Sequence, residues 1–299
     1  MKKMLFVMNP FAGLRRANRH LTDILLTFNQ AGYEVITHMT LGQGDAAEVV
    51  ERHGKDMDLV VCCGGDGTLN ETITGLLRAG ADTPIGYIPA GSTNDFAASL
   101  NLSTNILKAA QEAVEGEPVR YDVGKFGDRY FSYVASFGAF TKSSYTTPQN
   151  IKNALGHTAY VLSGITELSQ IRNEHIRMEI DGQVVEDDFL FGAICNSTSV
   201  GGILTLDPKM VDMGDGLFEI LLIRAPQSLA EISECLQALQ SQQYNCAMIT
   251  FRSARKVRIY ANPDMPWTLD GEKEDGHEMV DVENLHHAVR LIQKRESYD

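Results

Sequence analysis

A glycine-rich turn that carries one acid is the part of this sequence best suited to bind a phosphate group. Residues 59–71 read LVVCCGGDGTLNE, an apolar run that breaks into glycines around Asp66 and then enters a helical pattern. The main-chain N–H groups of such a strand–turn–helix junction bind polyphosphate, and the helix N-terminus adds partial positive charge. Asp66 is a suitable neighbour for phosphate only if a divalent cation lies between the two. The junction therefore predicts a nucleotide and a metal, although its spacing matches neither the Walker loop nor the dinucleotide motif.

Three other segments combine turn residues with groups that bind phosphate or metal. Residues 9–13 (NPFAG) follow the first apolar run and alone indicate an ordinary turn. Residues 89–95 (PAGSTND) also follow an apolar run, and their polar side chains are equally typical of a helix N-cap. Residues 266–272 (PWTLDGE) place two carboxylates around a glycine, where an Asp-Gly pair by itself indicates a hairpin. Two turns that each carry an acid follow two adjacent strands, and this pairing favours a shared binding site over two unrelated turns.

The first 120 residues alternate strand-like and helix-like patterns. The expected strands cover residues 4–8, 33–40, 59–63 and 85–88, and the expected helices cover 18–31, 44–53, 69–77 and 106–115. Such alternation predicts a parallel sheet with crossover helices, whose ligands bind at the carboxyl ends of the strands. The turns after the first, third and fourth strands all fall at that edge.

From about residue 121 the pattern changes to strands in close succession, separated by Gly, Pro and Asp-Gly turns. The expected strands cover residues 129–137, 175–180, 187–195, 217–223, 248–251, 256–260 and 286–292, with helices at 151–171 and 229–242. This succession predicts an antiparallel β-sandwich. We therefore expect an α/β fold with a nucleotide-binding parallel-sheet domain at residues 1–121 and a β-sandwich substrate domain at 122–285. A C-terminal segment at 286–299 can return to the first domain.

Composition and charge argue against several classes of protein. The 299 residues are 43% hydrophobic and 22% charged, as is typical of folded domains with their own cores. A net charge of −13 argues against general nucleic-acid binding, while a local basic patch that contacts anionic lipid remains compatible with it. No apolar run reaches transmembrane length, and the N-terminal run is too short for a signal peptide. The five cysteines lie in apolar patterns, which predicts reduced core residues of a cytoplasmic protein.

The ordered set of motifs resembles the diacylglycerol kinase catalytic family, in particular its soluble bacterial lipid kinases. The resemblance covers almost the whole chain and rests on Asn9-Pro10-x-x-Gly13, Gly64-Gly65-Asp66-Gly67-Thr68-x-Asn70-Glu71, Pro89-x-Gly91-Ser92-x-Asn94-Asp95, Asp212-Met213-Gly214-Asp215-Gly216 and Asp270-Gly271-Glu272. The glycine–aspartate motif alone is shared with NAD kinases, sphingosine kinases and ceramide kinases, so the order of the whole set carries the resemblance. It implies an NAD kinase/diacylglycerol kinase-like nucleotide-binding domain.

The resemblance also implies ATP as the phosphoryl donor and Mg²⁺ as the metal. The implied ATP-binding residues are Asn9, Pro10, Phe11, Ala12, Gly13, Thr40, Gly65, Asp66, Gly67, Thr68, Leu69, Asn70, Glu71 and Ser92. A structural Mg²⁺ is implied at Asp212, Asp215 and Leu217, with water linking it to a catalytic Mg²⁺ near Asp66 and Asp95. The chain departs from the family pattern at Ser92, where Thr is commoner, at Ala12, where Ser is common, and in a metal loop one residue longer than the frequent form.

Phosphoryl transfer depends on positioning and charge neutralisation more than on covalent chemistry by the protein. The glycine turns contain no lysine, so main-chain amides and Mg²⁺ must stabilise the phosphates. By the resemblance, Glu272 or its neighbour Asp270 takes the proton from the lipid hydroxyl. Spacing does not decide between the two carboxylates, and we favour Glu272 with Asp270 in support.

We therefore expect an ATP- and Mg²⁺-dependent lipid kinase that phosphorylates the hydroxyl of diacylglycerol to give phosphatidic acid, a step of phospholipid biosynthesis. It would be cytoplasmic, with transient contact at the inner face of the membrane. A homodimer is compatible with the resemblance. The alternatives are a kinase of a soluble substrate of the NAD kinase type, a kinase of another lipid such as phosphatidylglycerol, and a catalytically silent regulator. The last would not need Asp66, Asp95, Asp215 and Glu272 together.

Overall fold

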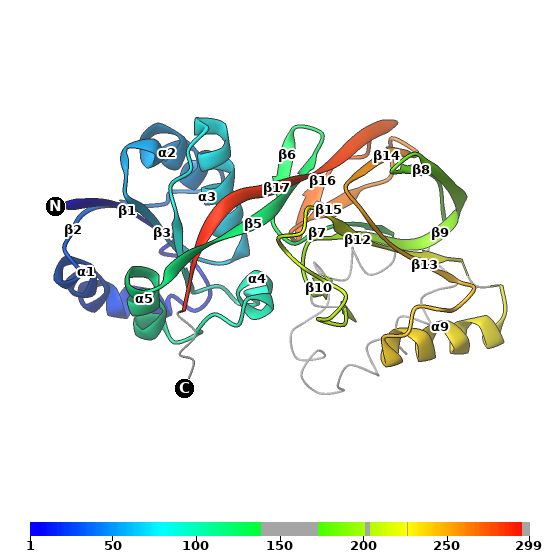
Figure 1. The fold of residues 1–299 in the computed structure, drawn as a ribbon, viewed down its shortest axis with the longest axis horizontal. Coiled ribbons are helices and arrows are strands. Elements are labelled where there is room, and N and C mark those ends of the chain that lie inside the picture. Colours follow the sequence, from blue (N-terminus) through cyan, green and yellow to red (C-terminus); the bar gives the residue numbers. More distant parts are fainter. Residues whose placement is uncertain (139–172, 201–203, 226, 295–299) are drawn as a thin grey trace. The chain divides into compact units, whose positions relative to one another are not determined.

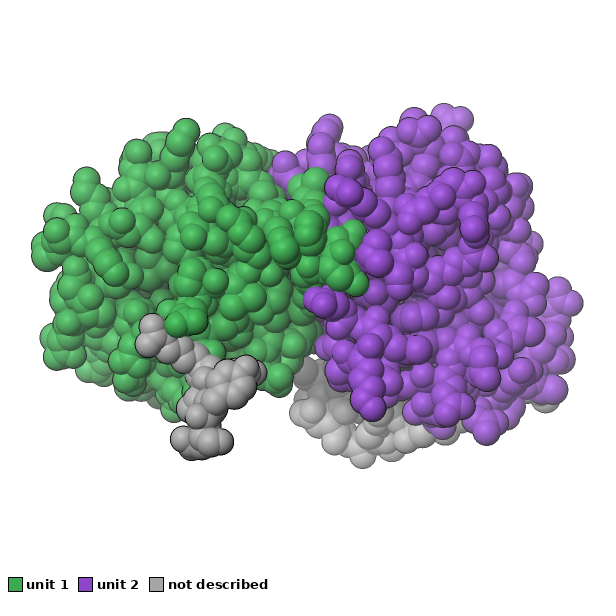
Figure 2. Space-filling view, in the orientation of Figure 1, with its two compact units in different colours: residues 1–123, 213–216, 285–299 green, residues 124–212, 217–284 purple. Residues whose placement is uncertain are grey.

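The computed structural model describes residues 1–138, 173–200, 204–225 and 227–294 of the chain. The chain divides into two compact units, coloured separately in Figure 2. The first unit contains Met1–Val123, Met213–Gly216 and Leu285–Asp299, and the second contains Gly124–Asp212 and Leu217–Asn284. The helix expected at residues 151–171 lies outside the described residues.

The first unit is built around a parallel sheet (Figure 1). Its strands are β1 (Lys2–Met8), β2 (Tyr33–Met39), β3 (Leu59–Gly64) and β4 (Ile85–Pro89), in the order β4-β3-β1-β2. Its helices are η1 (Arg16–His20), α1 (Leu21–Gln30), α2 (Asp45–His53), η2 (Gly54–Asp56), α3 (Asp66–Ala79), α4 (Asp95–Ser99) and α5 (Ile106–Glu115). The alternation of strands and crossover helices confirms the predicted α/β class.

Helices cover the sheet of the first unit (Figure 1), and its strand β3 is accordingly apolar throughout. All six residues of β3 are buried, which is typical of a parallel strand that is covered on both faces. From β1, Met4, Phe6 and Met8 pack in one core cluster with Ile24 and Phe28 of α1. The rings of Phe6 and Phe28 meet edge to face at 5.4 Å. This packing fixes the carboxyl ends of the strands, from which the glycine turns begin.

The second unit is antiparallel, as expected for the sandwich domain. Its strands are β6 (Arg129–Phe131), β7 (Val134–Gly138), β8 (Glu174–Ile180), β9 (Gln183–Cys195), β10 (Ser199–Val200), β11 (Leu204–Thr205), β12 (Phe218–Arg224), β13 (Ile249–Ala254), β14 (Lys256–Tyr260), β15 (Trp267–Leu269) and β16 (Glu272–Glu274). It also contains helix α9 (Leu229–Ser241) and parts of β5 (Glu117–Phe126) and β17 (Met279–Gln293). The main path of pairing runs β16-β15-β7-β9-β8-β14-β17.

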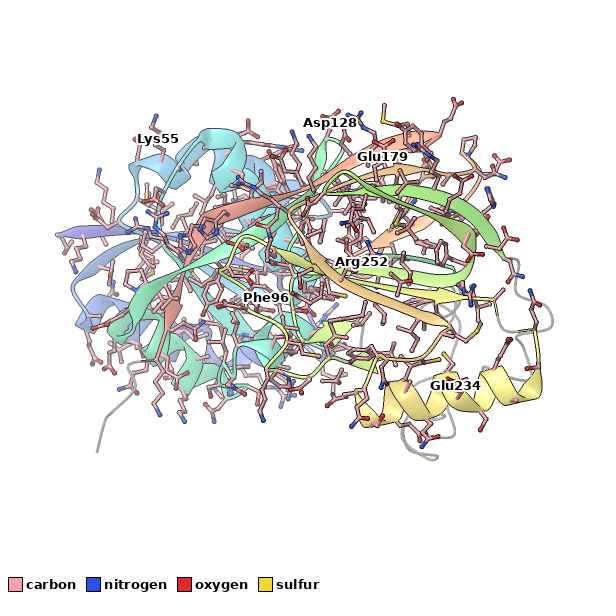
Figure 3. The ribbon with its side chains drawn as sticks, turned by 45° about the vertical axis from the view of Figure 1, so that its right-hand side comes forward. Lys55, Phe96, Asp128, Glu179, Glu234 and Arg252 are labelled. Atoms are coloured by element: carbon pink, nitrogen blue, oxygen red, sulfur yellow. The ribbon has the colours of Figure 1, made fainter. Side chains whose placement is uncertain are left out.

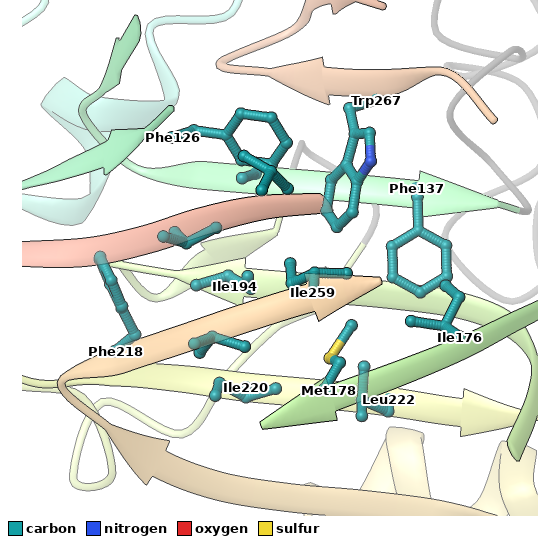
Figure 4. Close-up of a cluster of buried hydrophobic side chains, with 14 of the residues drawn as sticks. Phe126, Phe137, Ile176, Met178, Ile194, Phe218, Ile220, Leu222, Ile259 and Trp267 are labelled. Atoms are coloured by element: carbon teal, nitrogen blue, oxygen red, sulfur yellow. The ribbon is translucent and has the colours of Figure 1, made fainter. Parts of the chain in front are cut away.

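Aromatic side chains pack together in the second unit's core (Figure 4). The Trp267 ring lies 5.0 Å from that of Phe126 and 4.9 Å from that of Phe137, measured between centroids. All three residues are at most 1% exposed. Because such rings each bury a large apolar area, this cluster anchors β15 and the acid-bearing turn that follows it.

Some expected elements differ from the structure for identifiable reasons. The strand expected at residues 129–137 is two strands, β6 and β7, because the N–H groups of Ser132, Tyr133 and Val134 at their junction donate to the Asp270 carboxylate instead of to a neighbouring strand. Helix α3 begins at Asp66 and not at residue 69, since Gly65 is its N-cap and an acid in the first turn suits the helix dipole.

All five cysteines are free and buried, and burial raises the pKa of the Cys63 thiol to about 12. Within the part of the chain that the structure describes, no helix has the length and apolar character to cross a bilayer.

Candidate functional site

Three glycine turns pack against one another at the carboxyl edge of the first unit's sheet. They follow β1, β3 and β4, which are adjacent in the sheet. A Cβ atom on Gly91 would lie 2.6 Å from the Cα of Gly65, and one on Gly13 would lie 2.5 Å from the carbonyl oxygen of Ala90. The N–H of Ala90 also donates to the Gly64 carbonyl at 2.8 Å. Glycine is therefore required for these backbones to meet.

Gly91→Ala is expected to lower the free energy of unfolding by about 1–3 kcal/mol, because the new methyl group would overlap the Gly65 main chain. Urea denaturation of the full chain measures this change. Gly42→Ala is the matched control, since no atom lies within 4 Å of a Cβ there. Equal denaturation midpoints for the two variants would show that the turns are not held in close contact.

Asp66 joins two of these turns through its carboxylate. One carboxylate oxygen accepts the N–H of Asp95 at 3.1 Å and the other accepts the N–H of Phe96 at 3.2 Å, both in the first turn of α4. Asp66 is only 9% exposed, and the side chain of Phe96, labelled in Figure 3, is buried. The structure thus brings the Asp66 carboxylate to the main chain of Asp95, and the helix start stabilises the negative charge of Asp66.

The side chain of Asn9 closes the turn after β1 and also contacts the first turn of helix α3. Its Oδ1 accepts the N–H of Phe11 at 2.9 Å, and its Nδ2 donates to Thr68 Oγ1 at 3.3 Å. Thr40 is buried, and its N–H donates to the carbonyl of Met8 at 2.9 Å, beside the end of β1. Asn9, Thr68 and Thr40 therefore lie at the same edge of the sheet.

Other predicted nucleotide-binding residues have different surroundings. Glu71 accepts the N–H of Gly44 at 2.7 Å and that of Ala46 at 3.1 Å, so its carboxylate caps the start of α2. Leu69 is fully buried, which limits any contact with a ligand to its main chain. Phe11 and Ser92 are exposed. Pro10, Ala12, Gly67 and Asn70 are partly exposed.

In the second unit, Asp270 and Glu272 have different contacts. Asp270 is 7% exposed, and its carboxylate accepts the N–H groups of Ser132, Tyr133 and Val134 at 2.5, 2.9 and 3.1 Å. The side chain of Glu272 is 38% exposed and pairs with Arg129 at 3.2 Å. Asp270 therefore holds the bend between β6 and β7, whereas Glu272 is the more accessible of the two acids.

The predicted metal loop offers oxygen ligands. Asp212 and Asp215 are exposed, and the carbonyl oxygen of Leu217 accepts the side-chain N–H of Asn284 at 3.0 Å. Asn284 Oδ1 is buried without a hydrogen-bond partner among the described residues. Carboxylates, a main-chain carbonyl and an amide oxygen are the ligands that Mg²⁺ prefers, so the residues present fit this ion.

Asp122 is a buried acid that the sequence analysis missed. It is 1% exposed, and its carboxylate accepts the N–H of Gly216 and that of His287, each at 2.7 Å, and contacts His286 Nδ1 at 3.1 Å. Ligand atoms of Asp122, His286 and His287 lie within 4.8 Å of one another and could hold a metal, although imidazoles favour borderline metals over Mg²⁺. The signal in the sequence that could have indicated this buried acid is its position between Tyr121 and Val123.

Comparisons with known proteins agree along the whole chain. Residues 3–126 match the diacylglycerol kinase catalytic domain, and residues 137–293 match the YegS C-terminal NAD kinase beta sandwich-like domain. The diacylglycerol kinase of Bacillus subtilis strain 168 is 31% identical over 298 residues, which cover 99% of this chain and 98% of the relative. That of Staphylococcus carnosus strain TM300 is 33% identical over 273 residues, or 91% of this chain and 89% of the relative.

Solved structures show the same fold. The crystal structure of a diacylglycerol kinase from Bacillus anthracis strain Sterne superposes with a TM-score of 0.74 at 22% identity, covering 100% of this chain and 98% of that one. A second crystal structure from the same strain gives a TM-score of 0.79 at 23% identity, covering 100% and 97%.

Proposed function

This chain belongs to the diacylglycerol kinase catalytic family, and from that premise we propose that it transfers the γ-phosphoryl group of ATP to the hydroxyl of diacylglycerol, giving phosphatidic acid in an Mg²⁺-dependent reaction. The observation that carries the proposal is the meeting of three glycine turns, two of them joined by Asp66, at one edge of a parallel sheet. Nucleotides bind at this edge in α/β sheets.

The first unit supplies the nucleotide site in this proposal. The turns at residues 9–13, 65–71 and 89–92 surround the phosphates, and the main-chain N–H groups at the start of α3 bind them, in a site without lysine. The starts of α3 and α4 lie at these turns and add positive potential. Asp66 and Asp95 hold the metal that accompanies the nucleotide, and Asp66 also fixes the start of α4.

The second unit supplies the base and the lipid site. Glu272 takes the proton from the acceptor hydroxyl, while Arg129 orients its carboxylate. Asp270 keeps the bend before β7 in place through the N–H groups it accepts. Since diacylglycerol resides in a bilayer, the reaction requires transient contact with a membrane.

Asp212, Asp215 and Leu217 hold the structural Mg²⁺, with Asn284 Oδ1 as an additional buried oxygen. Mg²⁺, when bound, neutralises charge on the transferring phosphoryl group and its neighbours. The chain's own contribution is to present oxygen ligands and to keep them in place, as Asp122 does for the main chain of Gly216.

Transfer of labelled phosphate from ATP to a panel of acceptors tests the proposal. Purified full chain is incubated with Mg²⁺ and mixed micelles of diacylglycerol, phosphatidylglycerol, ceramide or undecaprenol, and separately with NAD. We expect label on diacylglycerol, loss of label with EDTA and recovery with excess Mg²⁺. Label on NAD alone would indicate a soluble-substrate kinase, label on another lipid would change the substrate, and bound nucleotide without any transfer would indicate a silent regulator.

A further inference from the structure

The first unit contains a hollow whose lining includes no residue of the glycine turns. Its volume is about 350 Å³, within the range of about 300–1,000 Å³ that is usual for small-ligand pockets. Arg16, Arg19 and His20 line one side, and Thr104, Asn105, Ile106 and Leu107, at the start of α5, line the other. None of the residues assigned to ATP or metal lines it.

Two arginines that line this hollow, Arg16 and Arg19, have no acidic partner in the part of the chain that the structure describes. Arg16 and Arg19 form no ion pair with an acid among the described residues, although the chain has a net charge of −13 and abundant carboxylates. The neighbouring Arg15 does not line the hollow and lies over the Phe11 ring at 5.0 Å. Arginines left without acidic partners around a concave surface create a local positive potential, which attracts an anion.

The opposite side offers main-chain donors. Helix α5 has ten residues, and its cap Asn105 accepts the N–H of Lys108 at 3.1 Å. The N–H groups of Ile106 and Leu107 belong to the first turn and have no acceptor within the helix. Both residues line the hollow. Residues that carry helix-start N–H groups and residues that carry guanidinium groups line this one cavity, and both kinds of donor complement the oxygens of a phosphate.

We propose that this hollow is a second anion site, which binds a phosphate monoester through Arg16, Arg19 and the first turn of α5. Two guanidinium groups favour a dianion, because each can bind two phosphate oxygens in its planar fork. The ligand is either a soluble phosphate monoester or the head group of a phospholipid. The site stands independently of the proposed kinase activity, since it shares no residue with the nucleotide turns or the proposed base.

Amide chemical shifts of the full chain, labelled with ¹⁵N and ²H, locate the binding. Glycerol 3-phosphate is titrated into the wild type, into R16Q/R19Q and into the matched control R52Q/R78Q, which removes the same charge from α2 and α3. We expect the amides of Ile106 and Leu107 to shift in the wild type and control, and the dissociation constant to rise about tenfold or more in R16Q/R19Q. Unfolding midpoints check that the variants are folded.

A vesicle arm separates the two ligand sources. Co-sedimentation is compared for phosphatidylcholine vesicles that contain phosphatidic acid or, at equal charge, phosphatidylserine. Shifts with glycerol 3-phosphate support a soluble ligand, and R16Q/R19Q-sensitive binding to phosphatidic acid alone supports a lipid head group. The proposal is overturned if R16Q/R19Q equals the control in both arms, including the case in which glycerol 3-phosphate moves only amides of residues 64–71 and 89–95.

Discussion

Glu272→Gln is expected to lower turnover with diacylglycerol about 10²–10⁴-fold, the usual contribution of a general base. The amide is nearly isosteric with the carboxylate but cannot take the proton of the acceptor hydroxyl. Little change in stability is expected, because the side chain is 38% exposed and its pair with Arg129, itself 41% exposed, is a surface ion pair. The rate of labelled phosphate transfer and the urea denaturation midpoint measure the two effects separately.

Glu274→Gln is the matched control, because Glu274 binds the same arginine at 2.6 Å and lies on the same short strand, β16. Its side chain is only 14% exposed, and we do not assign it a role in proton transfer. We expect its turnover to stay within about fivefold of the wild type, the range that the loss of one partly exposed ion pair allows. A similar fall in both variants would mean that Arg129, and not the Glu272 carboxylate, is what matters. Full activity of Glu272→Gln would remove Glu272 from the reaction.

Local patterns predict those elements whose ends are marked by nearby residues. The helix at residues 106–115 has the expected bounds because Asn105 caps it and Gly116 ends it. The strand at residues 256–260 is likewise found as expected. In contrast, β17 extends from Met279 to Gln293, well beyond the expected 286–292. The apolar alternation is interrupted at His286 and His287, where His287 has a φ of 53°, so the pattern alone shows only part of the strand.

The contacts that organise the candidate site could not be predicted from the sequence, because each acid finds its partner far along the chain. Asp66 accepts N–H groups 29 and 30 residues away, and Glu71 accepts those of residues 27 and 25 positions earlier. Asp270 binds N–H groups 136–138 residues away. The hydrophobic periodicity of a segment does not predict such long-range hydrogen bonds, since they depend on which turns the sheet brings together. The motif order selects these acids as candidates, and the fold determines which N–H groups each one accepts.

Asp66→Asn is expected to lower turnover about a hundredfold or more, through loss of a charge at the phosphate turns. Asp66→Ala is expected to abolish it. Stability is also expected to change, because Asp66 accepts the N–H groups of Asp95 and Phe96 and an amide has only one acceptor oxygen. Leaving one of these partly buried donors unsatisfied costs about 1–3 kcal/mol. The denaturation midpoint and the transfer rate, measured at a temperature where the variant is folded, give both quantities.

Asp181→Asn is the control that separates the effect of Asp66→Asn on turnover from its effect on stability. Asp181 also accepts two main-chain N–H groups with its carboxylate, from Arg255 at 3.2 Å and Lys256 at 3.0 Å, but at an exposed turn of the second unit. It therefore loses the same charge and the same kind of hydrogen bond without any proposed contact with nucleotide. We expect its turnover to remain close to that of the wild type. If Asp66→Asn loses no more activity than its unfolded fraction accounts for, the Asp66 carboxylate serves only to hold the start of α4. A loss that persists in fully folded protein would place its charge in the reaction.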